Sequence, residues 1–461
     1  MTKIREIVYK FVYRVIALVS EVLFSSPARL ALFSFAGVIF FFSFLLSMPW
    51  ATHDYGRQPY YQALFTAASA TTVTGLTSVD TATTWTYAGQ VVILTAIQVG
   101  GLGIITVAVL FTYAVSHRLN VRSKVLAMGA AGAGQISDVG RLLRTIAVTT
   151  FSIEAVLAAL LFPHFLSRGL GLIDSLWKSI FYSVSSFNNA GFTIDVGGLG
   201  IYQNDPWILT IICAGVFIGS LGFPVFLIIQ LRGFSWKKWN LHTKLTISST
   251  IFLLLFGAIL FFLADSGNDK MYGDMSTWQR FLHSLFYSVN TRSGGFNLVD
   301  TQSMNKSSVM VSDVLMFIGG GSASTSGGIK VTTFAILCLA VAAEARGDDD
   351  MQVFGRRIPV TVLRQAVSIT FLGAILVGVS SALISHIGDI DISRALFEAT
   401  SAFGTCGLSL GVTQELPPRG LYVLSVLMFA GRVGTITLAS ALAIRSRKQL
   451  YRNPEERPII G

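Results

Sequence analysis

Hydrophobic residues are gathered into long uninterrupted runs along this chain, and short polar segments separate the runs. Eight of the runs are about 20 residues or longer, which is the length of helix that crosses the hydrocarbon core of a bilayer. The runs cover residues 28–50, 91–115, 142–162, 207–231, 245–264, 314–342, 364–387 and 421–444. The pattern therefore predicts eight membrane-spanning helices.

A shorter amphipathic segment lies between the two runs of each successive pair. The four segments cover residues 62–70, 175–187, 277–290 and 392–403, and at about 9 to 14 residues they have half the length of a crossing. Ser175, Ser276 and Asp391 are residue types that begin helices. The pattern predicts half-helices that enter the membrane and turn back, which lipid tolerates only where they are buried in protein or line water. The alternative is four amphipathic helices on the surface.

All four short segments share one sequence pattern. Each begins with an apolar pair that ends in Phe, continues with small and hydroxyl residues, and closes on a Gly followed by Leu or Phe. The closing glycines are Gly75, Gly191, Gly295 and Gly407, and the third copy is one residue shorter. Internal repetition of this kind indicates similar units arranged about a common axis.

The expected fold is an all-α membrane protein with four span–pore-loop–span units around a pseudo-fourfold central pore. The units occupy residues 28–115, 141–231, 244–343 and 363–445, after an N-terminal interfacial helix at 1–27 and before a C-terminal tail at 446–461.

Composition and charge support a membrane protein. Of 461 residues, 52% are hydrophobic and 13% are charged, whereas soluble domains have about 25% charged residues. Most of the 34 Lys and Arg residues lie in the two tails and in the connections between units. Both termini are therefore expected in the cytoplasm, and the half-helices enter from the more acidic outer side. This placement explains the net charge of +10 without a nucleic-acid partner.

The four tetrapeptides that end in the repeated glycines have no acid, base or nucleophile in common, so their shared feature is the backbone. Glycine permits positive φ and close approach. Four such turns around an axis would present rings of carbonyl oxygens that replace the hydration shell of a potassium-like cation. The predicted filter comprises Thr72, Val73, Thr74, Gly75, Asn188, Asn189, Ala190, Gly191, Arg292, Ser293, Gly294, Gly295, Gly404, Thr405, Cys406 and Gly407.

The second run of the third unit contains a glycine-rich stretch that a regular helix would hold poorly, since each Gly costs about 1 kcal/mol relative to Ala. The helix is therefore expected to break below the filter, and the alternative is a flexible kink that serves helix packing. The family resemblance given below implies that the break is a movable gate, which comprises Gly319, Gly320, Gly321, Ser322, Ala323, Ser324, Thr325, Ser326, Gly327, Gly328, Lys330 and Arg432.

Three basic residues, Arg292, Lys330 and Arg432, fall inside the predicted membrane region, where charges are costly and normally face the protein interior. We expect Arg432 to form a cationic barrier beneath the filter, or alternatively to pair with Glu154, an acid in the middle of a predicted span. Arg292 is expected to brace its filter turn from behind. Lys330 either anchors the glycine-rich stretch or extends toward the cytoplasm.

Four span–pore-loop–span units with a single glycine per filter resemble the Trk/Ktr/HKT superfamily of potassium transporters. With eight spans, the chain most resembles the KtrB type, the membrane subunit of Ktr potassium uptake systems, over residues 28–445. The resemblance implies potassium uptake through a homodimer in the inner (cytoplasmic) membrane, surrounded by lipid. It also implies sodium dependence, a gating loop in the pore, and a cytoplasmic KtrA-like ring of nucleotide-binding regulatory subunits. Gly at position 75, where Ser accompanies sodium preference, favours potassium.

Two other classes of function remain for comparison. An intramembrane enzyme would need a nucleophile with a base, or metal ligands, within the spans, and the sequence offers neither, nor a cofactor site. An anion carrier would need the N-termini of the half-helices to face the ion. Uptake of potassium or rubidium against sodium or chloride separates these classes.

Overall fold

The computed structural model describes residues 27–54, 58–103, 139–265, 267–268, 272–273, 275–298 and 301–434. The expected N-terminal helix before residue 27, the ends of two predicted spans after residues 103 and 434, and the C-terminal tail lie outside the described residues.

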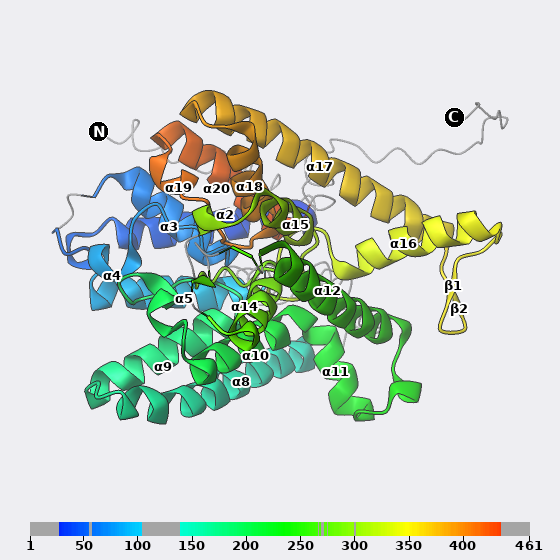
Figure 1. The fold of residues 1–461 in the computed structure, drawn as a ribbon, viewed down its shortest axis with the longest axis horizontal. Helices are drawn as coiled ribbons and strands as arrows, with labels where there is room; N and C mark the ends of the chain where they lie inside the picture. Colours follow the sequence, from blue (N-terminus) through cyan, green and yellow to red (C-terminus); the bar gives the residue numbers. More distant parts are fainter. Residues whose placement is uncertain are drawn as a thin grey trace, which may run out of the picture.

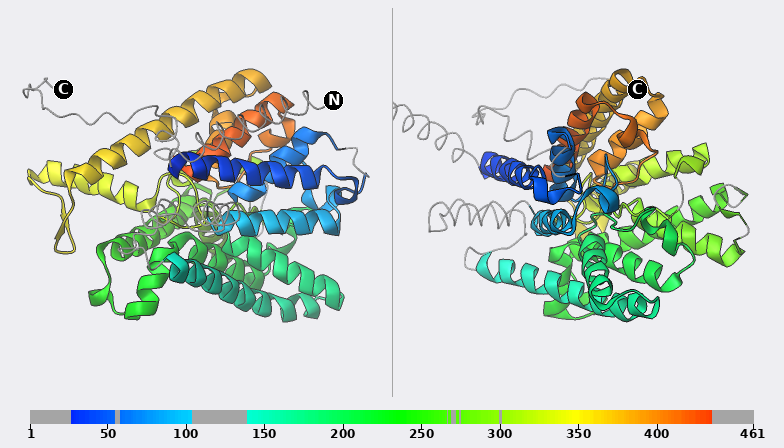
Figure 2. Two further views of the ribbon diagram at one scale, coloured as in Figure 1. Left: turned by 180° about the vertical axis from the view of Figure 1, so that it is seen from behind. Right: turned by 90° about the vertical axis from the view of Figure 1, so that its left-hand side faces the viewer.

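The described chain repeats one order of helices four times: a helix of 20 to 29 residues, a short helix of 13 to 16 residues, and a third helix of 12 to 16 residues. The first unit has α2 (Pro27–Leu46), α3 (Tyr60–Thr72) and α5 (Tyr87–Gly101), and the second has α8 (Val139–Ser167), α9 (Leu172–Phe187) and α10 (Pro206–Leu221). The third has α12 (Leu241–Asp265), α14 (Thr277–Asn290) and α15 (Lys306–Phe317), and the fourth has α17 (Val360–Gly388), α18 (Ile392–Gly404) and α20 (Pro418–Val433). The right-hand view of Figure 2 shows the units arranged in chain order around a common centre.

The short helices begin and end where the sequence places their signals. Ser276 caps α14 in a capping box with Gln279, and the Asp391 side chain accepts a hydrogen bond from the amide of Ser393 at the start of α18. At their other ends, α3 and α18 stop at residues in the left-handed conformation, Val73 and Thr405. The left-handed conformation at these residues ends the helical hydrogen bonding and changes the direction of the chain.

The exposed side chains of the long helices are those of a protein in lipid. Phe40 in α2, Phe252 in α12 and Phe371 in α17 are 58%, 60% and 65% exposed, far more apolar surface than soluble proteins leave in contiguous patches. Within the described residues, three helices are long and apolar enough to cross a membrane: Arg144–Ser167 of α8, α12 and α17. The chain is therefore a helical membrane protein.

The predicted span at 207–231 consists of two helices with a sharp bend between them. α10 ends at Leu221, α11 (Phe223–Arg232) follows, and their axes differ by 89°. Gly222 between them has φ +91°, and Pro224 is the second residue of α11. A positive φ and a proline ring both interrupt helical hydrogen bonding, which explains the bend.

The predicted break in the third unit is present. α15 ends at Phe317, and α16 (Val331–Arg346) begins at Val331. The thirteen residues between these helices contain the glycine-rich stretch and are called the 318–330 segment below. In Figure 1, α16 leads outward to a two-stranded hairpin of β1 (Gln352–Val353) and β2 (Arg356–Arg357), which projects from the helices.

Short elements complete the described connections. They are η1 (Pro49–Ala51), α4 (Thr81–Thr84), η3 (Gly198–Tyr202), η4 (Trp236–Lys238), η5 (Thr301–Ser303) and α19 (Val412–Glu415). The buried apolar side chains form two large clusters, one that joins the first and second units with part of the third and one that joins the third and fourth units with part of the first. Packing between units thus holds the four short helices toward one centre.

Candidate functional site

The four repeated glycines meet at the centre of the molecule. A methyl group on Gly75 would lie 3.2 Å from the Cα atom of Gly191, and one on Gly191 would lie 2.8 Å from that of Gly295. A methyl group on Gly407 would lie 3.1 Å from the Cα atoms of both Gly295 and Gly75. The glycines therefore form a closed ring in chain order, although they are far apart in sequence.

The carbonyl oxygen of the residue before each glycine lies against the glycine of the neighbouring unit. The pairs are Thr74 with Gly407, Ala190 with Gly75, Gly294 with Gly191, and Cys406 with Gly295, and a methyl group on the glycine would lie 2.1, 2.4, 3.0 and 2.5 Å from the respective oxygen. Four main-chain oxygens from four units thus follow one another around the ring. Any side chain at the glycine positions would overlap them.

In all four tetrapeptides the backbone alternates between left-handed (positive φ) and right-handed (negative φ) conformations. The second residue has positive φ in every copy: Val73 57°, Asn189 60°, Ser293 83° and Thr405 46°. The closing glycine also has positive φ, between 68° and 95°, whereas the residue between them does not. Alternation of left- and right-handed residues turns successive carbonyl groups to the same side of the chain, which is the arrangement that coordinates a cation.

The amide groups of the turns point away from the ring, back to the short helices. The amide of Thr74 donates to the Ser69 carbonyl at 2.8 Å, and the amide of Cys406 donates to the Ser401 carbonyl at 2.8 Å. The amide of Ala190 donates to Ser185 in the same way, at 2.7 Å. The amide donors are therefore satisfied within each unit, whereas the carbonyl oxygens before the glycines lie against the glycines of neighbouring units.

The small hydroxyl residues of the repeat hold the turns in place. Ser69 Oγ accepts from the amide of Gly75 at 3.1 Å, and Ser401 Oγ accepts from the amide of Gly407 at 3.0 Å. In the shorter third copy, Asn290 Oδ1 accepts from the amide of Phe296 at 3.2 Å. The repeat therefore specifies the supports of the turns as well as the turns themselves.

Sequence reasoning missed a second support. The residue after the repeated Phe is Tyr in the second and third copies and Glu in the fourth, and in these three copies it binds the chain that leaves the turn. Tyr182 donates to Asp195 at 2.6 Å and Tyr287 donates to Asn297 at 3.0 Å. Glu398 accepts from Ser409, from Thr413 Oγ1 at 2.9 Å, and from the amides of Leu410 and Val412 at 3.2 Å each. The available signal was a side chain that can form hydrogen bonds at the same position of each copy.

Three glycines in the second helices allow those helices to touch the short helices. Methyl groups on Gly100, Gly219 and Gly431 would each lie 1.9 Å from a carbonyl oxygen, that of Thr71, Phe187 and Phe403 respectively. Each of these oxygens belongs to the residue just before a tetrapeptide. These three glycines thus have the same packing role beside the turns. Gly319 departs from the pattern, since its nearest neighbour is the Gly327 carbonyl.

The 318–330 segment lies under the turns and contacts other units. The amide of Gly321 donates to the Ser220 carbonyl at 2.7 Å, and Thr325 Oγ1 donates to the Gly219 carbonyl at 3.1 Å. A methyl group on Gly327 would lie 2.5 Å from Thr405 Oγ1. The segment therefore spans the region between α10 and the fourth filter turn.

Arg432 ties this segment to the first unit. Its side chain is buried, and it donates through Nη2 to the Gly100 carbonyl at 2.6 Å and through Nη1 to the Thr325 carbonyl. The alternative pairing with Glu154 is wrong, because Glu154 binds Gln98 and Asn188 instead.

The other two intramembrane cations also bind carbonyl groups. Lys330 Nζ donates to the carbonyls of Ser326 at 2.5 Å and Gly327 at 3.4 Å, so it contacts its own segment. Arg292 turns away from the ring and donates to the carbonyls of Thr250 at 2.8 Å and Gly319 at 3.3 Å. This arrangement agrees with the expectation that Arg292 braces its turn from behind.

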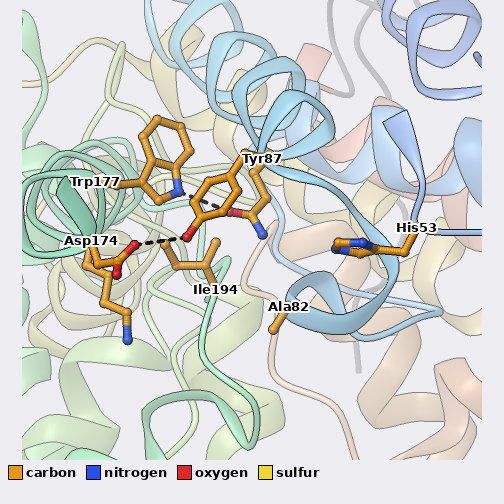
Figure 3. A pocket seen from close by; sticks show the side chains of 8 residues that line it. His53, Ala82, Tyr87, Asp174, Trp177 and Ile194 are labelled. Atoms are coloured by element: carbon orange, nitrogen blue, oxygen red, sulfur yellow. Dashed lines mark hydrogen bonds between the residues drawn. The ribbon is translucent and has the colours of Figure 1, made fainter. Parts of the chain in front are cut away.

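A small pocket lies to one side of the ring, between the starts of α5 and α9 (Figure 3). Its volume is about 160 Å³, and its lining residues are His53, Ala82, Tyr87, Gln90, Asp174, Trp177, Lys178 and Ile194. The Tyr87 hydroxyl donates to Asp174 at 3.0 Å, and Trp177 Nε1 donates to Gln90 at 3.0 Å, so several of its polar groups bind one another. No residue of the four tetrapeptides lines it, and the ring remains the candidate site.

Comparison with known proteins identifies relatives along almost the whole chain. A family model described as TrkH, cation transport protein, matches residues 42–450. Ktr system potassium uptake protein B of Bacillus subtilis is 35% identical over 441 residues, which cover 95% of this chain and 97% of that protein. The potassium/sodium uptake protein NtpJ of Enterococcus hirae is 33% identical over 442 residues, with coverage of 95% and 97%.

A solved structure has the same fold. The crystal structure of the potassium transporter TrkH from Vibrio parahaemolyticus superimposes with a TM-score of 0.72, over 89% of this chain and 84% of that one. The sequences are 20% identical in this comparison. The likeness therefore concerns the arrangement of the helices.

Proposed function

The chain belongs to the TrkH family of cation transport proteins, as its sequence predicted, and we propose that it takes up potassium ions across the cytoplasmic membrane. Membership places it among transporters and not among enzymes. The observation that carries the substrate proposal is the ring of main-chain oxygens at Thr74, Ala190, Gly294 and Cys406. The names of two relatives, both potassium uptake proteins, support the same substrate.

The four tetrapeptides act as the selectivity filter in this proposal. A potassium ion that enters the ring exchanges its water shell for carbonyl oxygens, which are fixed by the hydrogen bonds to Ser69, Ser401 and their counterparts. The short helices end at the turns, so their partially negative C-terminal ends also favour a cation. A ring that excludes side chains at its glycines allows the oxygens to approach the ion.

The membrane arrangement that fits this pathway has eight spans and four half-helices that enter from outside. The four pore units at 28–115, 141–231, 244–343 and 363–445 would each contribute one quarter of the filter. Both termini then lie in the cytoplasm, with the basic connections between units on the same side. The long helices with exposed Phe side chains face the lipid.

The 318–330 segment serves as the gate. It lies beneath the turns, contacts Thr405 through Gly327, and is tied to α5 through Arg432. Opening requires that these contacts break or shift, because they bridge the second, fourth and first units. Lys330 binds within the segment and keeps its end folded.

Sodium dependence and regulatory partners complete the proposal. The relative named potassium/sodium uptake protein supports a sodium-dependent transport. The Ktr relatives are named as parts of a system, which supports a partner component. In this proposal the partner is a cytoplasmic KtrA-like nucleotide-binding ring, and this chain forms a homodimer.

Ion uptake by cells that lack their own potassium transporters tests the proposal. Cells that express the chain should accumulate potassium and rubidium in preference to sodium and should not accumulate chloride. Gly75→Ser should reduce the preference for potassium over sodium, because a side chain there meets the Ala190 oxygen at a φ of +89°. No potassium or rubidium uptake by the wild type, with and without a co-expressed regulatory ring, would reject the proposed substrate.

A further inference from the structure

Glu154 is a buried carboxylate in the middle of a membrane-spanning helix. It lies on α8 and is 5% exposed, whereas Phe151 and Val156 of the same helix are 57% and 58% exposed and face outward. Its side chain therefore points into the protein. An acid at this depth is costly to retain, and such residues usually serve an ion pathway.

Both oxygens of Glu154 bind neutral amide groups. Oε1 accepts from Asn188 Nδ2 at 2.8 Å, and Oε2 accepts from Gln98 Nε2 at 3.2 Å. Gln98 Oε1 in turn accepts from Asn188 Nδ2 at 3.2 Å. Among the ion pairs of the described residues, none includes Glu154. The two amides thus hold the carboxylate in place without neutralising it.

Asn188 connects Glu154 to the filter. It is the first residue of the second tetrapeptide, and its side chain is fully buried behind the turn. Arg292 occupies the corresponding position in the third unit, and Lys330 and Arg432 lie beneath the ring. Three basic side chains are therefore held at the third turn and in the 318–330 segment, and each of them binds carbonyl oxygens among the contacts described above. A cation in the filter would be repelled by all three.

We propose that Glu154 carries a negative charge when a cation occupies the filter, and that this charge increases the affinity of the filter for the transported ion. This inference rests on the proposed transport function. The carboxylate acts from behind the second turn by Coulomb attraction, which is weakly screened in a buried site. It does not coordinate the ion, because Asn188 lies between them.

Two variants of Glu154 distinguish the proposed charge from a purely structural role, because the two roles predict opposite orders of transport activity. Glu154→Gln keeps the length of the side chain and an oxygen for Asn188, but it removes the charge. Glu154→Asp keeps the charge but shortens the side chain by one methylene. If charge matters, the Asp variant transports better than the Gln variant at low ion concentration. If only the hydrogen bonds to Asn188 and Gln98 matter, the Gln variant is the better one.

Rubidium uptake as a function of its concentration tests the inference, with each rate corrected for the amount of folded chain in the membrane. Glu154→Gln should raise the KM about tenfold while the maximal rate changes less, since it weakens binding of the ion. Glu154→Asp should stay closer to the wild type. Glu344→Gln, which removes the same charge from the exposed end of α16, is the matched control and should leave the KM unchanged.

An unchanged KM in Glu154→Gln, or a higher KM in Glu154→Asp than in Glu154→Gln, would overturn the inference. If the wild type itself failed to transport rubidium, the proposed function would fail first. A direct measurement covers variants that fold poorly: the stabilisation of the purified chain against heat by added potassium should need a higher potassium concentration in Glu154→Gln than in the wild type. Equal concentrations would reject the charge role.

Discussion

The carbonyl oxygen of Thr74 lies against Gly407, where a methyl group on the glycine would stand 2.1 Å from that oxygen. This contact joins the first filter turn to the last and closes the ring. The ring thus depends on a pairing between two of the most distant parts of the chain. A perturbation at either residue should reach the whole filter.

Replacement of Gly407 by Ala should therefore abolish most of the uptake. Its φ of +95° disfavours any L side chain, and the new methyl group overlaps the Thr74 oxygen. Strain of about 1–3 kcal/mol is expected from the overlap and the backbone, and a loss of this size in ion binding lowers uptake roughly ten- to hundredfold. Rubidium uptake at low concentration measures the effect.

Gly378→Ala is the control for this change. Gly378 is in the middle of α17, and no heavy atom lies within 4 Å of a methyl group placed on it. Alanine also favours the helix by about 1 kcal/mol relative to glycine. Uptake by this variant should equal that of the wild type, whereas normal uptake by Gly407→Ala would contradict the filter assignment.

Arg432→Gln should raise the basal ion flux. The guanidinium joins the 318–330 segment to α5 through the carbonyls of Thr325 and Gly100, and a shorter neutral amide cannot span both. Removing the charge also lowers the barrier to a cation beneath the filter. Arg419→Gln, at the exposed start of the same helix, is the control. Flux through purified protein in vesicles without regulatory subunits tests the prediction, and equal flux in Arg432→Gln and the wild type would count against the gate.

The repeat in the sequence was sufficient to predict the centre of the molecule. Four copies of one pattern, each with a Phe, small polar residues and a closing glycine, led to the short helices and to the turns that now meet at Gly75, Gly191, Gly295 and Gly407. The pattern could be recognised because all four copies adopt the same backbone conformation and therefore keep similar residues. The break at the glycine-rich stretch could be predicted because glycine is a poor helix former.

Contacts between units could not be predicted from the repeat. The bend at Gly222 was missed because a single glycine before a proline, within an otherwise apolar run, does not distinguish a bent helix from a straight one. The partner of Arg432 was missed because every residue has a main-chain carbonyl group, so the sequence does not indicate which carbonyl an arginine binds. Glu154 was noticed as an isolated acid, but its bond to Asn188 depends on the packing of α8 against α9.

Glu398 should stabilise the fourth turn. It is fully buried and accepts hydrogen bonds from Ser409, from the amides of Leu410 and Val412, and from Thr413. Glu398→Ala leaves these donors unsatisfied, which should lower the free energy of unfolding by roughly 2–4 kcal/mol.

The control for Glu398→Ala is the same substitution at Glu415, an exposed acid in the same unit. Glu415→Ala removes an exposed ion pair with Arg394, 3.0 Å long, which should cost less than about 1 kcal/mol. Thermal unfolding of both variants in the same detergent gives the comparison. Equal stability of the two variants would mean that the buried network contributes little.

Acid should weaken the contacts of Asp205, which lies outside the helices described as long enough to cross a membrane. Asp205 precedes that helix, and its carboxylate accepts from His164 Nε2 and from Arg168 Nη2, both at 2.6 Å. Burial by itself raises the pKa of Asp205, but the hydrogen bonds from His164 and the Ile208 amide and the nearby positive charges outweigh it, so the pKa is lowered. A lowered pKa in the folded state means that the ionised carboxylate stabilises the fold. This contribution is complete above the ordinary carboxyl pKa of about 4 and disappears as the pH falls through the lower folded-state value.

Asp205→Asn should accordingly lower the melting temperature by a few degrees at pH 7, because the amide cannot replace the charge beside Arg168. The difference from the wild type should stay constant down to about pH 4 and shrink below it. Asp349→Asn, an exposed acid in the connection after α16, should show no such difference at any pH. Melting curves of the purified chain between pH 3 and pH 7 decide the matter. A difference that grows toward acid would reverse the sign of the argument, because it would show that the protonated carboxyl is the form that the fold prefers.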